Sequence, residues 1–389
     1  MTPLERADIE PVVRRALNAP AAVLLAFSVE ELAGGDGQDL GVVRAAGDAL
    51  VGTATVHWTV IGKRLAPVSA ANAPHAWSHP RREASAYASG LLGDLPEGLS
   101  APRCLGTSEG EDGALVLWLD EVANAASRWT LADYARVAHD LGRFNGAYLA
   151  GRPLPRQPWL SRHWLHSWLA EGADAVAALD ADRSHPLVDR VFPAAVAGSL
   201  TRLWERRAAQ LAALDRLPHT FCHNDAFRRN LFTSATWTVA VDWAFAGSGP
   251  LGAELAPLVW GSLGFLEAEW HERRALERGV LDAYADGLRA AGARVSTDDI
   301  HRGYATTAAL RYGAGVVRLM VPVLRDEALQ HGPERVLGIP FGDVVEHWAA
   351  LIREVLALGE PGRRPLRQAP RRSPVSTDSH PSTEAEPRP

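Results

Sequence analysis

The spacing of apolar and polar positions predicts strands in the first part of the chain. Residues 49–65 set Thr, Val and Trp in alternation, and residues 114–122 form an apolar run that ends in acids; both are typical of strands. Residues 79–96, between them, have helical spacing, and we expect this helix to stop at Gly93. Its apolar stripe is formed by Ala84, Tyr87, Ala88 and Leu91.

Helical patterns dominate the rest of the chain. Thr130 is a capping residue before a helix that runs to Gly151, and Ser296 can cap another that begins at Thr297. A last helix covers about residues 341–358. One helix between them buries a stripe with every fourth residue apolar: Leu276, Val280, Tyr284 and Leu288.

These patterns predict an α+β protein with two lobes. We expect a strand-rich N-terminal lobe over residues 1–120 and a larger helical lobe over residues 121–358. Residues 221–245 interrupt the second lobe with short strands. Residues 359–389 are rich in Pro, Arg and Ser and have few apolar side chains to bury, which predicts a disordered tail.

Composition narrows the class of protein. The chain has 389 residues, 47% of them hydrophobic, which suits two lobes. Its net charge of -6 gives no basic field for nucleic acid or an anionic membrane. Two cysteines, Cys104 and Cys222, exclude a disulfide framework and fit a reducing compartment. No apolar run approaches the length of a membrane span, and the N-terminus lacks a good signal-peptide cleavage site, so we expect a soluble cytoplasmic protein.

A polar run between apolar flanks, FCHNDAFRRNLF at residues 221–232, carries the candidate chemistry. Two short strands follow, and a turn centred near Thr236 would set Asn230 opposite Asp242, about 5 Å apart. Their oxygen atoms suit Mg²⁺, which would be bound to a polyphosphate. Asp225, on the loop before the first strand, would accept a proton from a substrate hydroxyl or orient it, as in kinase-type phosphoryl transfer.

The ordered motif resembles that of the aminoglycoside phosphotransferase and choline kinase-like family, a branch of the protein-kinase-like fold. The family's His-Gly-Asp-x-x-x-x-Asn segment is matched by His223, Asn224, Asp225 and Asn230. Its metal-binding segment is matched by Asp242, Trp243, Gly249 and Pro250. The resemblance implies that Asp225 is catalytic, that Asn230 and Asp242 bind magnesium, and that His223 supports the loop. Two positions depart from the family: Asn224 replaces Gly, and Glu254 replaces Asp.

The same resemblance implies an ATP-binding lobe. Lys63, the only lysine of the sequence, would pair with the phosphates and be held by Glu83; the alternative is an exposed lysine at a strand end. Residues 118–124 stand where the family has the hinge that reads adenine. The glycine-rich segment that would cover the phosphates is equally consistent with a flexible hairpin turn; its glycines are Gly34, Gly35 and Gly37.

The sequence therefore predicts an ATP- and Mg²⁺-dependent O-phosphotransferase that acts on a hydroxyl of a small molecule. The acceptor stays open between an aminoglycoside-like compound, a sugar, an amino alcohol and a biosynthetic intermediate. Aromatic residues near the acceptor side fit a hydrophobic core better than a substrate cage: Trp159, Trp164, Trp168 and Trp260. The rival interpretations are a kinase of peptide Ser/Thr, a nucleotide-binding pseudokinase or scaffold, and a hydrolase with a metal site at His223, Asp225 and Asp242.

Overall fold

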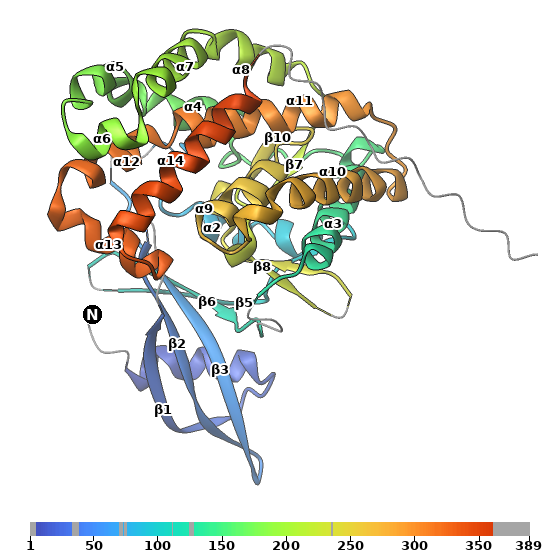
Figure 1. Cartoon of the computed structure of the whole chain (residues 1–389). Helices are drawn as coiled ribbons and strands as arrows, with labels where there is room; N and C mark the ends of the chain where they lie inside the picture. Colours follow the sequence, from blue (N-terminus) through green and yellow to red (C-terminus); the bar gives the residue numbers. More distant parts are fainter. Residues whose placement is uncertain are drawn as a thin grey trace, which may run out of the picture.

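The structure is a computed structural model that describes residues 5–32, 39–69, 73, 76–110, 112–123, 128–234 and 236–360. A small lobe built on an antiparallel sheet lies below a larger, mostly helical lobe (Figure 1). The segment with Gly34, Gly35 and Gly37 and nearly all of the predicted tail lie outside the described residues.

The sheet of the small lobe has five strands in the order β1-β2-β3-β6-β5, each antiparallel to its neighbours. Helix α1 (Arg6–Ala16) buries Ile9, Val12 and Val13 against it. The predicted strand at residues 49–65 divides at a turn, because Gly52 adopts φ +61° and starts a hairpin. The strands are β1 (Val23–Leu32), β2 (Asp39–Val51), β3 (Ala54–Leu65), β5 (Cys104–Glu109) and β6 (Leu115–Asp120).

Helix α2 (Arg82–Ala88) differs from its prediction in length and in orientation. It ends at Ala88, and a separate 3-10 turn, η1 (Leu91–Gly93), follows it. The predicted stripe is only partly buried or exposed, whereas Arg82, Glu83 and Ala86 are buried. Apolar spacing misled here because the two charged side chains of this short helix find polar partners inside the protein.

The large lobe contains twelve α-helices among the described residues, together with two small sheets. Its helices are α3 (Leu131–Leu149), α4 (Trp164–Ala170), α5 (Ala173–Asp182), α6 (Pro186–Val191), α7 (Ala194–Glu205), α8 (Arg207–Asp215), α9 (Ser262–Gly264), α10 (Arg273–Ala290), α11 (Thr297–Ala308), α12 (Val317–Arg325), α13 (Glu327–Leu337) and α14 (Phe341–Leu358). Shorter 3-10 or π-helical segments are η2 (Arg228–Asn230), η3 (Trp243–Phe245), η4 (Pro257–Gly261), η5 (Trp270–Glu272) and η6 (Ala309–Ala314).

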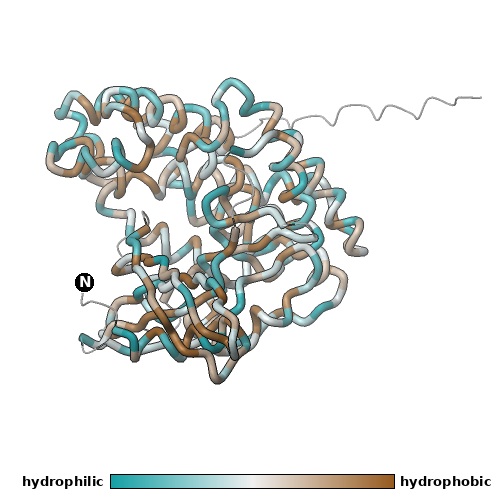
Figure 2. The backbone as a smooth tube through the Cα atoms, turned by 90° about the horizontal axis from the view of Figure 1, so that it is seen from below, coloured by the Kyte–Doolittle hydropathy of each residue, from teal (hydrophilic) through white to brown (hydrophobic). Residues whose placement is uncertain are grey.

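Several predicted helices are confirmed. Thr130 caps α3 through a hydrogen bond from the Asp133 main-chain N, and Ser296 caps α11 in the same way. Helix α14 spans the predicted residues, and the predicted stripe of α10 is buried. Apolar stretches of the backbone run through the middle of the molecule (Figure 2).

Helices α3 and α10 pack so closely that glycine is required between them. A Cβ added at Gly142 would lie 2.3 Å from the Tyr284 main-chain oxygen, and one at Gly287 would lie 2.1 Å from that of His139. The close packing fixes α3, and its Asn145 Nδ2 donates to the Phe221 main-chain oxygen at 2.9 Å. The α3–α10 pair thus supports the strand that leads into residues 223–230.

Two short sheets carry the polar run that the sequence analysis singled out. Strand β7 (His219–Cys222) pairs with β10 (Gly247–Pro250), and β9 (Thr238–Ala240) lies between β4 (Leu99–Ser100) and β8 (Leu231–Thr233). Because Leu231 pairs with Ala240, Asn230 stands opposite Val241, whose N donates to the Asn230 main-chain oxygen at 2.9 Å. The predicted register, with Asn230 opposite Asp242, is wrong by one residue. Asp242 lies beyond the strand, in a left-handed conformation with φ +61°.

One helical stretch corrects the expectation about apolar runs. Thr297–Arg325 is long and apolar enough to cross a membrane by length and composition, yet 67% of its apolar window is buried inside the protein. Such burial is typical of a core helix.

Candidate active site

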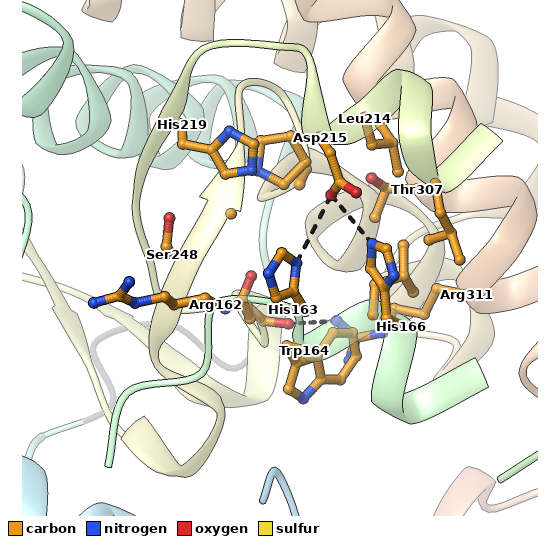
Figure 3. Close-up of a pocket in the computed structure, with 16 residues that line it drawn as sticks. Arg162, His163, Trp164, His166, Leu214, Asp215, His219, Ser248, Thr307 and Arg311 are labelled. Atoms are coloured by element: carbon orange, nitrogen blue, oxygen red, sulfur yellow. Dashed lines mark hydrogen bonds and ion pairs between the residues drawn. The ribbon is translucent and has the colours of Figure 1, made fainter. Parts of the chain in front are cut away.

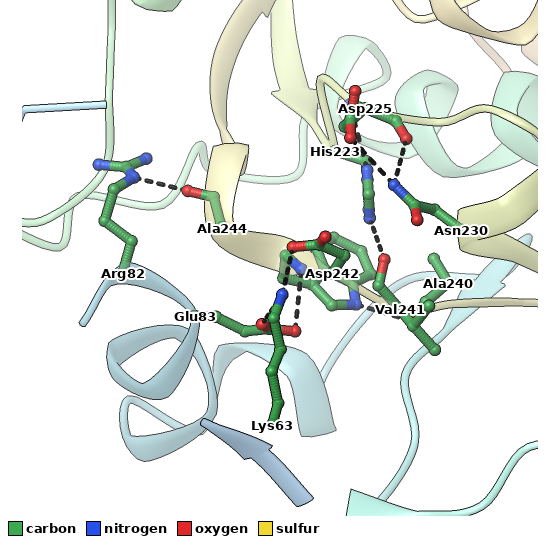
Figure 4. A network of polar contacts seen from close by, with 11 residues as sticks. Lys63, Arg82, Glu83, His223, Asp225, Asn230, Ala240, Val241, Asp242 and Ala244 are labelled. Carbon is green, nitrogen blue, oxygen red and sulfur yellow. Dashed lines mark hydrogen bonds and ion pairs between the residues drawn. The ribbon is translucent and has the colours of Figure 1, made fainter. Parts of the chain in front are cut away.

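A buried lysine connects the sheet, helix α2 and the segment after β9 (Figure 4). Lys63 Nζ, on β3, lies 2.8 Å from Glu83 Oε2 and 2.8 Å from Asp242 Oδ1. Lys63 is 7% exposed and Glu83 is 1% exposed. The other oxygen of Glu83, Oε1, accepts a hydrogen bond from the Trp243 main-chain N at 3.2 Å. Three residues that the sequence analysis selected from distant segments therefore meet in one ion-pair cluster.

The electrostatics of this cluster leave a surplus of negative charge. One ammonium group faces two carboxylates, which stabilise it where an unpaired ammonium would be costly to bury. Burial opposes the ionisation of Asp242, but Lys63 outweighs it and lowers the pKa of that carboxyl. The Asp242 side chain is still 35% exposed, so an ionised carboxylate stands where a cation from solvent can reach it.

Arg82 joins helix α2 to the large lobe directly next to Glu83. Its side chain is fully buried, and its Nε and Nη2 donate to the main-chain oxygens of Ala244 (2.6 Å) and Ala246 (2.8 Å), while Nη1 donates to that of Trp159. Burial lowers the pKa of Arg82 to about 10, so the guanidinium stays protonated at neutral pH. This tie fixes α2, and with it Glu83, against the segment that follows Asp242.

His223 holds the polar loop against the strand segment that leads to Asp242. Its Nε2 donates to the Val241 main-chain oxygen at 2.8 Å, and its Nδ1 accepts from the Asp225 main-chain N at 3.2 Å. These two bonds define a neutral imidazole with the proton on Nε2. Burial lowers the pKa of His223, which agrees with the neutral form.

The structure explains why Asn224 is acceptable where the resembling family has Gly. Asn224 has φ +64°, a left-handed conformation that Asn tolerates better than most residues. Its main-chain N donates to Glu254 Oε1 at 2.7 Å, and its Nδ2 donates to the Phe245 main-chain oxygen at 3.0 Å. The side chain thus connects the loop to η3, a contact that glycine cannot make. Glu254, the second position that differs from the family, is buried and accepts the bond from the Asn224 main-chain N. Burial raises the pKa of its carboxyl.

Asp225 and Asn230 are held together at the two ends of the loop. Asn230 Nδ2 donates to Asp225 Oδ2 at 3.0 Å and to the Asp225 main-chain oxygen at 3.1 Å. The amide nitrogen is therefore used inside the loop, and the amide oxygen is the atom that remains for a cation.

Arg311 is the residue that the sequence analysis missed. Its Nη2 forms an ion pair with Asp225 Oδ1, and its Nη1 donates to the Asn224 main-chain oxygen. The guanidinium also lies 4.6 Å from the ring centroid of Trp164. Arg311 lies on the π-helical segment η6, a rare conformation that often occurs at functional sites. One signal was available in the sequence: an arginine inside the apolar run 304–317 has to find a partner when it is buried.

Arg228 and Arg229, which stand inside the polar run, have structural partners. Arg228 is buried with its guanidinium 4.7 Å from the Trp129 ring centroid, and Arg229 Nε donates to Glu267 Oε1 at 2.8 Å. The tryptophans at 164 and 168 stack with ring centroids 5.5 Å apart and pack on Phe245. This packing agrees with the core interpretation of the aromatic stripe.

A pocket opens on the large lobe beside Asn224 and Arg311, two residues that support the loop with Asp225 (Figure 3). Its lining includes Asn224 and Arg311, and also His163, His166 and Asp215.

Comparison with known proteins identifies relatives of the chain. Residues 36–296 match the sequence model of the phosphotransferase enzyme family. A search of curated proteins found no significant match.

Several solved structures align with most of the chain. An amicoumacin kinase, hAmiN, in complex with AMP-PNP, Ca²⁺ and Ami superposes with a TM-score of 0.51 at 12% identity, over 91% of this chain and 96% of that one. A GDP complex of aminoglycoside 2'-phosphotransferase-IIIa gives 0.45 at 14% identity, over 91% and 99%. A choline/ethanolamine kinase family protein from Mesorhizobium loti gives 0.45 at 16% identity, over 90% and 98%. The expected two-lobed, protein-kinase-like α+β fold is confirmed.

Substitutions of Asn224 separate its backbone role from its side-chain role. Both Asn224→Gly and Asn224→Ala lose the bond to Phe245, but only Ala has to place a Cβ in the left-handed conformation, at a cost of about 1–2 kcal/mol. We expect Asn224→Ala to lower the free energy of unfolding more than Asn224→Gly does, by about 1 kcal/mol, in urea denaturation. An alanine variant as stable as the glycine variant would contradict this account of the loop.

The buried imidazole of His223 predicts a pH dependence of stability. Because its pKa in the folded protein is lowered from 6.5, the unfolded chain binds the proton first as the pH falls. The contribution of this group to the free energy of unfolding is fully present above about pH 6.5 and is lost as the pH falls below that value. We expect denaturation curves between about pH 7 and pH 5 to show a smaller loss for His223→Gln, which does not titrate, than for the wild type. Equal losses would show that His223 is not the group responsible.

Proposed function

Since the chain belongs to the phosphotransferase enzyme family, we propose that it transfers the γ-phosphate of ATP, with Mg²⁺, to a hydroxyl of a small molecule. The main support for this proposal is the position of the buried Lys63, which is bonded to both Glu83 and Asp242 at 2.8 Å. It lies next to the segment that contains Asp225 and Asn230 (Figure 4). A lysine on a strand paired with a helix glutamate, and an aspartate and an asparagine for the metal, are the parts that kinase-type transfer needs.

On the nucleotide side, Lys63 would bind the phosphates of ATP. Its ammonium is already desolvated and oriented by Glu83, so little ordering is needed when a phosphate takes part of its hydrogen bonding. Arg82 keeps α2 in place during this exchange, because its three bonds go to the main chain of the large lobe.

The donor set next to Lys63 fits a magnesium ion. Asp242 offers an ionised carboxylate and Asn230 an amide oxygen, both hard ligands of the kind that Mg²⁺ prefers. The negative surplus of the Lys63 cluster favours an added cation. When bound, the ion would supply charge neutralisation on the β- and γ-phosphates.

Asp225 would accept a hydrogen bond from the acceptor hydroxyl and take its proton as the phosphate is transferred. The carboxylate is fixed for this task from two sides, by Arg311 at Oδ1 and by Asn230 at Oδ2. Arg311 acts as a positioning residue, since it contacts Asp225 and the Asn224 main chain. A carboxylate held in this way reaches a bound hydroxyl without first being reoriented.

The acceptor would bind at the large lobe, which carries Asp225 and its supports Asn224 and Arg311. Proteins similar in fold include a kinase of amicoumacin and a choline/ethanolamine kinase family protein, which supports a small-molecule acceptor over a peptide. A pseudokinase usually lacks the lysine, the catalytic aspartate or the metal-binding aspartate; the sequence keeps Lys63, Asp225 and Asp242, which counts against that alternative. Activity in the cytoplasm, where ATP is available, stays part of this proposal.

The substitution Asp225→Asn tests the assigned chemistry. It keeps the shape of the side chain but removes the proton acceptor, so transfer should fall by about 100-fold or more while ATP binding is retained. The measurement is the transfer of labelled phosphate to each member of a panel of sugars, amino alcohols, aminoglycosides and Ser/Thr peptides. Asp282→Asn, on the exposed side of α10, is the matched control and should keep wild-type transfer.

Three results would contradict the proposal. In the first, the wild type neither binds Mg²⁺–ATP nor transfers phosphate to any acceptor. In the second, Asp225→Asn transfers phosphate as fast as the wild type. Transfer confined to the peptides would instead favour the protein-kinase alternative.

A further inference from the structure

Two histidines and an aspartate gather at one side of the pocket in the large lobe (Figure 3). His163 is the residue before α4, His166 lies in the first turn of α4, and Asp215 is the last residue of α8. Their candidate ligand atoms all lie within 4.8 Å of one another. None of the three belongs to the set assigned to ATP, Mg²⁺ or Asp225.

The spacing of these atoms is that of a metal site. Asp215 Oδ1 lies 3.1 Å from His166 Nε2 and 3.9 Å from His163 Nδ1. In a tetrahedral zinc site with bonds of about 2.0–2.1 Å, neighbouring ligand atoms stand about 3.3 Å apart. These two separations lie on either side of that value, and all three ligand atoms lie within 4.8 Å of one another, so side-chain rotations would bring them around one ion.

Local structure explains how the three ligands meet. Residues three apart lie on the same face at the start of a helix, so His163 and His166 can point to one place; their ring centroids are 5.1 Å apart. Asp215 stands at the C-terminal end of α8, where the helix dipole disfavours a carboxylate and favours a cation beside it. All three side chains are partly exposed, which gives an ion a path from solvent.

The ligand types select the class of metal. Two imidazole nitrogens and one carboxylate oxygen suit Zn²⁺ and similar transition-metal ions, whereas Mg²⁺ and Ca²⁺ prefer oxygen ligands alone. We propose that His163, His166 and Asp215 bind one zinc-class ion through three protein ligands, with the remaining position open to water. The ion joins α4 to α8 at the edge of the pocket, separate from the proposed magnesium site at Asn230 and Asp242.

A nearby histidine supplies a matched control. His219 lines the same pocket, but it is not among the residues whose ligand atoms lie within 4.8 Å of one another. Its Nδ1 is already bonded to the Leu217 main-chain oxygen at 2.9 Å. The proposed site therefore predicts that His219→Ala keeps zinc binding, while His166→Ala and Asp215→Asn lose it.

Calorimetric titration of ZnCl₂ into the full chain, without nucleotide and with any histidine tag removed, tests the proposal. At about pH 7.5 we expect one Zn²⁺ per wild-type chain and a rise in Tm with zinc. His166→Ala and Asp215→Asn should each bind zinc about ten-fold more weakly or worse. Co²⁺ in place of Zn²⁺ should give the visible absorption of a tetrahedral site in the wild type and not in these variants.

Because the His166 and Asp215 side chains are partly exposed, we expect their variants to fold, and an unchanged metal-free Tm verifies this. Wild-type affinity in His166→Ala and Asp215→Asn would overturn the site. So would zinc binding that disappears in Asp242→Asn but persists in Asp215→Asn, since the ion would then occupy the nucleotide side. Equal affinity for Mg²⁺ and Zn²⁺ would overturn the assigned class of metal.

Discussion

The burial of one ammonium group between two carboxylates is the constraint on which the site depends. Lys63 comes from the sheet, Glu83 from α2 and Asp242 from the segment after β9, so the pairing is satisfied only when the two lobes meet in one arrangement. The desolvation cost of Lys63 would be several kcal/mol without these partners. Arg82 strengthens the same junction with bonds to three main-chain oxygens. The lobe contact and the candidate nucleotide site are therefore built from the same residues.

The loop that carries Asp225 is rigid for a different reason: its polar groups bond to one another and to the large lobe. Asn224 and Asp242 both adopt left-handed conformations, with φ +64° and φ +61°, which store strain that the surrounding hydrogen bonds offset. His223, Glu254 and Asn145 supply those bonds from inside the lobe. An aspartate fixed in this way suits a reaction in which positioning supplies much of the rate enhancement.

Much of this arrangement could be predicted from the sequence, because local rules governed it. Helix caps at Thr130 and Ser296 and the apolar stripe of α10 depend on spacing alone. The register of β8 and β9 was missed because the position of the short turn between them is not encoded by periodicity. The orientation of α2 was missed because a seven-residue helix carries too few apolar positions to define its buried face. Arg311 was missed because its partner, Asp225, lies 86 residues away in the sequence.

The effect of Mg²⁺ on nucleotide binding when Asp242 is changed shows whether this carboxylate, next to Lys63, binds the metal. Calorimetry with a non-hydrolysable ATP analogue compares the wild type with Asp242→Asn, in the presence of Mg²⁺ and of a chelator. We expect Mg²⁺ to strengthen binding to the wild type by about ten-fold or more and to have little effect on Asp242→Asn, which keeps the bond to Lys63 but loses the ionic ligand. Binding that is equally strong with the chelator, or a variant that keeps the full Mg²⁺ effect, would contradict this expectation.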